Sequence, residues 1–121
     1  PELFEFCQEA QVTCSMTDCW AVRYQKGDQQ TIHNHKSWGF TGILYLEFDP
    51  KVHTPTCFVA PWQDPRSDTT SLAYPRDVKE GTIFISPSYT LHFVHPNQVR
   101  KHRTIISFDL LPKLPDHQSV D

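Results

Sequence analysis

Turn-forming residues interrupt this sequence so often that they limit what the chain can fold into. Ten prolines stand against four glycines, and a proline inside a helix breaks or kinks it. Between the turns lie short runs rich in β-branched and aromatic residues, which is typical of strands. The expected strands span residues 12–16, 20–25, 29–34, 41–48, 56–62, 71–74, 82–86, 91–95 and 103–110. We therefore expect an all-β protein of about eight strands with little helix, built as a sandwich or jelly roll.

The length of 121 residues fits a single domain over residues 1–121. Residues 1–10 fit a short strand or a frayed helix, and the proline-studded tail at residues 112–121 is expected to be loose. In the strand at 41–48, both faces carry apolar side chains, so we expect both to be covered. Residues 1–10 or a second subunit would cover the face with Leu44, Leu46 and Phe48, which makes a homodimer an expectation.

The charge and the cysteines bear on partners and compartment. Eleven basic against fourteen acidic residues give a net charge of −3, which argues against a nucleic-acid surface. No apolar run approaches the roughly 18 residues that suggest a membrane span. The four cysteines form no C-x-x-C pair, so we expect free thiols and a cytoplasmic location.

Two histidines form the most distinctive local pattern. A turn at residues 26–28 precedes His33 and His35, which stand two positions apart. Because residues i and i+2 of a strand point to the same face, both imidazoles can reach one metal ion. A third ligand must then come from elsewhere in the chain.

The candidates for that third ligand are His92 and His95. They stand three positions apart, so in a continuous strand they face opposite sides and only one can join the site. His92 shares its face with Val94, whereas His95 shares its face with Leu91 and Phe93. The residues alone leave both candidates open.

The spacing of these residues resembles the two motifs of the cupins. Gly27, five residues and then His33-x-His35 match the opening of the first motif. Gly81, five residues, Pro87 and, after four more residues, His92 match much of the second. The resemblance implies a double-stranded β-helix, or jelly roll, with a metal inside the mouth of the barrel. The glutamate of the first cupin motif is missing, since no acidic residue stands between Asp28 and Glu47.

The chain resembles more closely the prolyl-hydroxylase-like oxygenases that use non-haem Fe(II) and 2-oxoglutarate. The matching phrases, in order, are His33-x-His35, residues 41–46, residues 81–88, His92 and residues 103–108. The resemblance implies Fe(II) held by His33, His35 and His92, with 2-oxoglutarate as co-substrate. It also implies Arg103 as the residue that grips the far carboxylate of 2-oxoglutarate, eleven positions after His92. A guanidinium suits that role because it can form two parallel hydrogen bonds with a carboxylate.

Other residues complete or alter the implied site. Ser107 shares a strand face with Arg103, and Tyr45 lies on the long strand, so both are candidate donors to the co-substrate. His35 stands where the family's H-x-D/E motif has its carboxylate. Three neutral imidazoles also suit zinc, nickel or copper, so another divalent metal is an alternative to iron.

Three hypotheses about function follow. The first is an Fe(II)- and 2-oxoglutarate-dependent dioxygenase, an oxidoreductase that hydroxylates a small molecule or a peptide. The second is a three-histidine cupin metalloenzyme that does not use 2-oxoglutarate. The third is a non-catalytic, cupin-like barrel that binds a ligand or a partner.

Overall fold

The computed structural model describes residues 13–35, 38–63, 66 and 70–113. These residues form eight strands and no helix. The strands are β1 (Cys14–Tyr24), β2 (Gln30–His33), β3 (Phe40–Glu47), β4 (Cys57–Gln63), β5 (Thr70–Ala73), β6 (Ile83–Pro87), β7 (His92–Val94) and β8 (Arg103–Pro112). The expected all-β class is confirmed.

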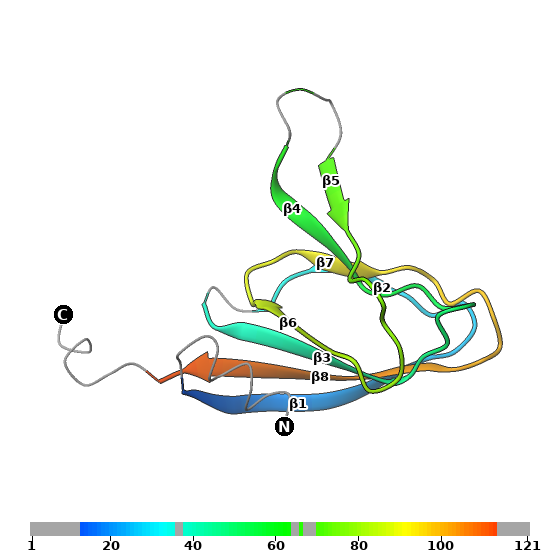
Figure 1. The fold of residues 1–121 in the computed structure, drawn as a ribbon, viewed down its shortest axis with the longest axis horizontal. Coiled ribbons are helices and arrows are strands. Elements are labelled where there is room, and N and C mark those ends of the chain that lie inside the picture. Colours follow the sequence, from blue (N-terminus) through cyan, green and yellow to red (C-terminus); the bar gives the residue numbers. More distant parts are fainter. Residues whose placement is uncertain (1–12, 36–37, 64–65, 67–69, 114–121) are drawn as a thin grey trace.

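The strands form two antiparallel sheets of four. One sheet has the order β1-β8-β3-β6, and the other has the order β2-β7-β4-β5. Figure 1 shows β1, β8 and β3 side by side in one layer, with β2 and β7 above them and the β4–β5 hairpin extending away. Two such sheets face to face form the expected jelly-roll barrel.

The buried core lies between the two sheets. Its members come from strands of both layers and from the loops that join them: Tyr24, Ile43, Tyr45, Phe48, Phe58, Val78, Val94 and Ile105. Strand β8 contributes a buried face of alternating residues, Arg103, Ile105, Ser107 and Asp109. Because side chains alternate along a strand, this one face of β8 presents two charged and one hydroxyl group to the interior.

Two irregularities changed the expected pattern of strands. Residues 12–16 and 20–25 were expected as separate strands, but β1 runs through both, with a bulge between Met16 and Asp18. A second irregularity lies between Tyr45 and Glu47 in the pairing of β3 with β8. The expected apolar face of Leu44, Leu46 and Phe48 is therefore wrong, because Phe48 is buried in the core while Leu46 is 49% exposed.

The C-terminal expectation also needs a correction. Pro112 is the last residue of β8, and the Lys113 amide donates to the Thr13 carbonyl at 2.6 Å. The expected loose tail therefore cannot begin at residue 112. The expectations for residues 1–10 and 114–121 lie outside the described residues.

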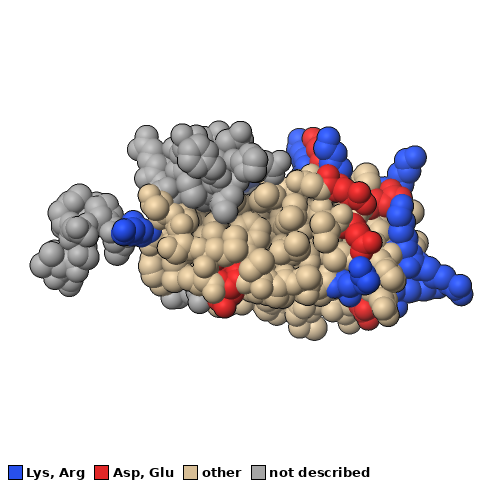
Figure 2. All heavy atoms as spheres, turned by 90° about the horizontal axis from the view of Figure 1, so that it is seen from below, with Lys and Arg blue, Asp and Glu red and all other residues tan. Residues whose placement is uncertain are grey.

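Charged side chains gather at one end of the molecule. Figure 2 shows them around the end where β1 finishes and β8 begins, while most of the rest of that face is uncharged. The ion pairs Arg23–Glu47 and Lys101–Asp49 belong to this end. Within the described part of the chain, no helix is long and apolar enough to cross a membrane.

Candidate metal centre

Three histidines converge at the end of the barrel away from this charged cluster. His33 ends β2 and pairs directly with His92, the first residue of β7. His35 follows β2 by two residues, and its amide donates to the Ser88 carbonyl at 3.0 Å. One ring nitrogen from each histidine lies within 4.8 Å of the other two. The spacing suits a single metal ion between three imidazoles.

Hydrogen bonds set the orientation and tautomer of each ring. The Nδ1 atoms of His33 and His92 lie 2.8 Å and 3.0 Å from the carbonyl oxygens of Thr31 and Thr90. A carbonyl oxygen only accepts hydrogen bonds, so each Nδ1 carries a proton and donates it. Nε2 of each neutral ring is then a free electron-pair donor, as a metal ligand must be.

His35 has a carboxylate instead of a carbonyl as its partner. Its Nδ1 lies 2.9 Å from Oδ1 of Asp109 on β8, and both side chains are more than nine-tenths buried. Oγ1 of Thr41 lies 3.1 Å from the same carboxylate oxygen and 3.1 Å from Oγ of Ser88. Because a threonine hydroxyl has one proton, donation to the carboxylate leaves Thr41 to accept the proton of Ser88. The chain of bonds ends at Asp109.

The environment keeps His92 neutral. Its pKa is lowered to about 4, mainly by burial and also by the neighbouring His33 and His35, against the opposing effect of the Thr90 carbonyl. The ring also contacts Phe58, with 5.5 Å between the two centroids. His92 is therefore unprotonated at neutral pH and available to bind a metal.

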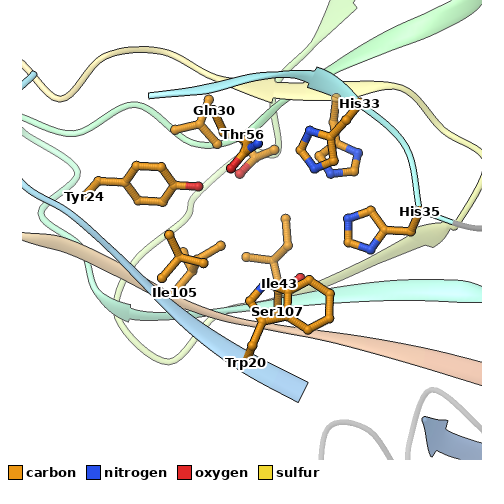
Figure 3. Close-up of a pocket in the computed structure, with 12 residues that line it drawn as sticks. Trp20, Tyr24, Gln30, His33, His35, Ile43, Thr56, Ile105 and Ser107 are labelled. Atoms are coloured by element: carbon orange, nitrogen blue, oxygen red, sulfur yellow. The ribbon is translucent and has the colours of Figure 1, made fainter. Parts of the chain in front are cut away.

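A cavity extends from the histidines between the two sheets. Its walls combine apolar side chains with a few polar ones: Trp20, Val22, Tyr24, Gln30, His33, His35, Ile43, Thr56, His92, Val94, Ile105 and Ser107. Figure 3 shows the histidines at one end and the Tyr24 hydroxyl pointing into the cavity from the other, near Gln30 and Thr56. Trp20 stacks on the ring of His35, with centroids 5.6 Å apart, and is 40% exposed. It therefore lies at the open, metal-binding end.

Arg103 lies behind the closed end of the cavity. Its side chain is 1% exposed, its Nε donates to the Thr54 carbonyl at 3.0 Å, and its Nη2 donates to Oγ1 of Thr56 at 3.3 Å. The guanidinium also lies over the ring of Tyr24, 5.1 Å from its centroid. Burial lowers the pKa of this group, against the opposing effects of Tyr45 and Tyr24. Its buried Nη1 has no hydrogen-bond partner among the described residues.

The remaining residues that the sequence suggested for the site lie in three different environments. Ser107 lines the cavity, as a donor to a ligand would. Tyr45 is fully buried outside the cavity lining, and its hydroxyl accepts a bond from the Thr56 amide at 3.1 Å. His95 is separate from the metal cluster and lies 2.7 Å from the Tyr74 hydroxyl through its Nε2. The two candidates for the third ligand are thus separated by the alternation of β7.

Sequence reasoning missed Tyr24, Thr56 and Asp109. Tyr24 is the cross-strand partner of Arg103 in the β1–β8 pairing, and burial raises its pKa, so its hydroxyl stays protonated and can donate to an anion. One signal could have found part of this set, because Asp109 is an acidic residue inside the apolar run expected as a strand over residues 103–110. That signal does not identify the partner of Asp109, which depends on how the strands pack together.

The donor set fits a transition metal. Three neutral imidazoles suit Fe(II), zinc, copper or nickel, and each is held by a second hydrogen bond, as metal-binding histidines usually are. Arg103 contacts two residues of the cavity lining, Tyr24 and Thr56, and its cationic group suits a carboxylate bound beside them. The residues present therefore match a metal and a bound acid.

Comparisons with known proteins agree with this arrangement. A family model described as "Putative 2OG-Fe(II) oxygenase" matches residues 18–109, which is more than half of the chain. A search of curated proteins found no match.

Solved structures with a similar fold include an oxidoreductase of the 2OG-Fe(II) oxygenase family from Burkholderia pseudomallei. Its TM-score is 0.65 at 15% identity, covering 90% of this chain and 50% of that one. A prolyl-4-hydroxylase from Pseudomonas putida has a TM-score of 0.60 at 13% identity, with coverages of 92% and 61%. HygX from Streptomyces hygroscopicus, solved with iron bound, has a TM-score of 0.60 at 11% identity, with coverages of 86% and 61%. The chain thus spans half to about three fifths of the length of these proteins.

Proposed function

The chain belongs to the 2OG-Fe(II) oxygenase family whose model matches residues 18–109, and from this premise we propose that it is an Fe(II)- and 2-oxoglutarate-dependent oxygenase. His33, His35 and His92 hold the iron. The observation that carries the proposal is the convergence of these three ring nitrogens within 4.8 Å, at one end of a cavity whose other end is lined by Tyr24 and Thr56, both in contact with the buried Arg103. A small 2-oxo diacid has a metal-chelating end and a free carboxylate end, so it matches both.

The chain's own residues bind and orient the co-substrate. When bound, Fe(II) and 2-oxoglutarate supply the activation of O₂, coupled to decarboxylation of the 2-oxo acid to succinate. The hydroxyls of Tyr24 and Thr56 face the cavity and donate to the far carboxylate. Arg103 supplies the positive charge behind them. In a site screened from water, such a charge attracts an anion much more strongly than at the surface.

The apolar walls keep water away from the reacting groups. Val22, Ile43, Val94 and Ile105 line the cavity together with the histidines. Exclusion of water strengthens the electrostatic contacts and limits side reactions of the oxidant. Trp20 stands over His35 at the open end, where the substrate to be hydroxylated enters. A small molecule or a peptide side chain fits an entrance of this kind.

Succinate production tests the proposal directly. Iron-loaded protein is incubated with 2-oxoglutarate under air, and succinate is measured by mass spectrometry or a coupled assay. We expect slow turnover even without the hydroxylated substrate, and we expect His92→Gln to abolish it. His95→Gln is the matched control, because His95 lies outside the metal cluster. If wild-type protein with bound iron produces no succinate, the proposed activity is wrong.

One observation favours a second candidate, a three-histidine metalloenzyme that does not use 2-oxoglutarate. His35 occupies the place where the resembled family has a carboxylate ligand. In this second case Arg103→Met, if it folds, leaves activity intact while His92→Ala abolishes metal binding. A folded Arg103→Met variant that binds iron normally but no longer binds 2-oxoglutarate supports the first candidate instead.

A further inference from the structure

We propose that Asp109 is a positioning residue that supplies, through His35, the negative charge that the metal centre lacks among its ligands. This inference rests on the proposed function for its biological meaning, but the geometry that carries it concerns metal binding alone. Asp109 is neither one of the three clustered histidines nor one of the residues that line the cavity. Its effect on the metal is exerted through the imidazole of His35.

The first step is the direction of the hydrogen bond. The 2.9 Å contact joins Nδ1 of His35 to Oδ1 of Asp109, and an ionised carboxylate only accepts hydrogen bonds. His35 therefore donates from Nδ1, which leaves Nε2 for the metal. A carboxylate behind an imidazole raises the basicity of the ligating nitrogen more than a neutral carbonyl does. His33 and His92 have only carbonyl partners, so His35 is set apart from them.

The second step is the count of charge. Two imidazoles and one carboxylate leave a divalent ion with a net charge of one, whereas three neutral imidazoles leave it with two. Asp109 brings the buried centre back to one without occupying a position on the metal. The compensating charge stands behind residue 35, which is the position of the carboxylate ligand in the resembled H-x-D/E motif.

The third step is that Asp109 is itself held in place. Thr41 on β3 donates to the same Oδ1, and Ser88 after β6 extends the network. Thr41, Ser88 and Asp109 are each at most 5% exposed. A carboxylate with this little freedom fixes the plane of the His35 ring, and the network joins the metal centre to the sheet that lies opposite β2 and β7.

A Co(II) titration followed by visible absorption separates this role from a purely structural one. Asp109→Asn keeps an oxygen that can accept from His35 but removes the charge. We expect it to fold, as judged by circular dichroism, and to bind Co(II) about 10- to 100-fold more weakly, the usual effect of losing such a partner. Asp49→Asn, which removes a carboxylate that is 25% exposed and paired with Lys101, is the control and should bind Co(II) as wild type does.

A double variant that moves the carboxylate from position 109 to position 35 is the decisive test. In the double variant that combines His35→Asp with Asp109→Asn, a carboxylate stands on the metal itself, and we expect most of the lost affinity to return with an altered Co(II) spectrum. The inference is overturned if Asp109→Asn binds Co(II) as tightly as wild type, if wild type binds no Co(II), or if the double variant binds no better than Asp109→Asn. An Asp109→Asn variant that does not fold also overturns it, because the role of Asp109 is then structural. Succinate production is measured separately, so a failure of the oxygenase proposal does not change the interpretation of the Co(II) titrations.

Discussion

His92 is the residue on which the metal centre depends most. It is the most buried of the three histidines, and its tautomer is set by the Thr90 carbonyl. We expect His92→Gln to reduce metal affinity by more than the roughly 100-fold upper range for loss of an outer hydrogen-bond partner. Isothermal titration with Zn(II) or Co(II) measures this. An affinity within a few-fold of wild type would show that His92 is not a ligand.

The same residue makes the metal-free protein sensitive to acid. The pKa of His92 is about 4 in the folded chain against an ordinary 6.5, mainly because of burial. As pH falls from about 6.5 to 4, His92 becomes protonated in the unfolded chain but stays neutral in the folded chain, so the unfolded state is favoured. Above pH 6.5 the stabilisation is fully present. We expect urea unfolding of chelator-treated protein to show a steeper loss of stability across this window than unfolding of His92→Gln, and equal slopes would contradict the assignment.

The proposed function assigns binding of the diacid to the end of the cavity near Arg103. Truncating one partner of a buried, charged hydrogen-bonded pair costs about 2–5 kcal/mol, which is a roughly 30-fold or larger rise in Kd. We therefore expect Arg103→Met to lose the thermal stabilisation that 2-oxoglutarate gives to the wild-type protein. Arg23→Met is the matched control, because Arg23 lies on the exposed face of β1 and pairs with Glu47. If Arg23→Met loses the same thermal shift, the binding of 2-oxoglutarate does not depend specifically on Arg103.

At the scale of strands, β3 and β8 meet at a glycine. Gly42 lies opposite Phe108, and a Cβ built on Gly42 would come within 2.1 Å of the Phe108 ring. A buried aromatic ring cannot move away without disturbing its neighbours. We expect Gly42→Ala to cost about 1–3 kcal/mol of folding free energy, the range for overpacked cores. Chemical denaturation of Gly42→Ala with and without Phe108→Leu tests this, since the smaller side chain should relieve the clash.

The strands were largely predictable because their signals are local. The alternation of β-branched and aromatic residues and the positions of turns placed every described strand to within a few residues. Strand geometry alone also predicted that His33 and His35 share a face and that only one of His92 and His95 can join them, but it left open which one. Two features that depend on irregular strand pairing were not predicted. They are the bulge in β1 and the burial of Phe48 in the core.

The site was predictable only where spacing in the sequence reflects distance in space. His33 and His35 are neighbours in the chain, whereas Asp109 is 74 positions from His35. An acidic residue inside an apolar strand, such as Asp109, indicates a buried polar site. Its partner, His35, is set by the packing of one sheet on the other. Tyr45 illustrates the reverse: its residue type suits a ligand donor, yet its hydroxyl accepts from the Thr56 amide.

For the molecule as a whole, the metal centre joins the two sheets. His33 and His92 belong to one sheet, and His35 is bonded to Asp109 of the other. An ion that binds only the folded state stabilises it, by about 2.7 kcal/mol at 100 times its Kd. We expect Tm to rise by several degrees on adding Fe(II) or Co(II) and to fall on adding a chelator, as measured by differential scanning fluorimetry. No change in either direction would mean that the histidines hold no metal in the folded protein.

The most direct test of the whole account is the anaerobic visible spectrum of the protein with Fe(II) and 2-oxoglutarate. Chelation of the 2-oxo acid by iron held between His33, His35 and His92 should produce a charge-transfer band. We expect the band to appear in wild type and in His95→Gln, and to be absent from His92→Gln. An unchanged spectrum in wild-type protein that demonstrably contains iron would contradict the assignment of this barrel as a 2-oxoglutarate-dependent oxygenase.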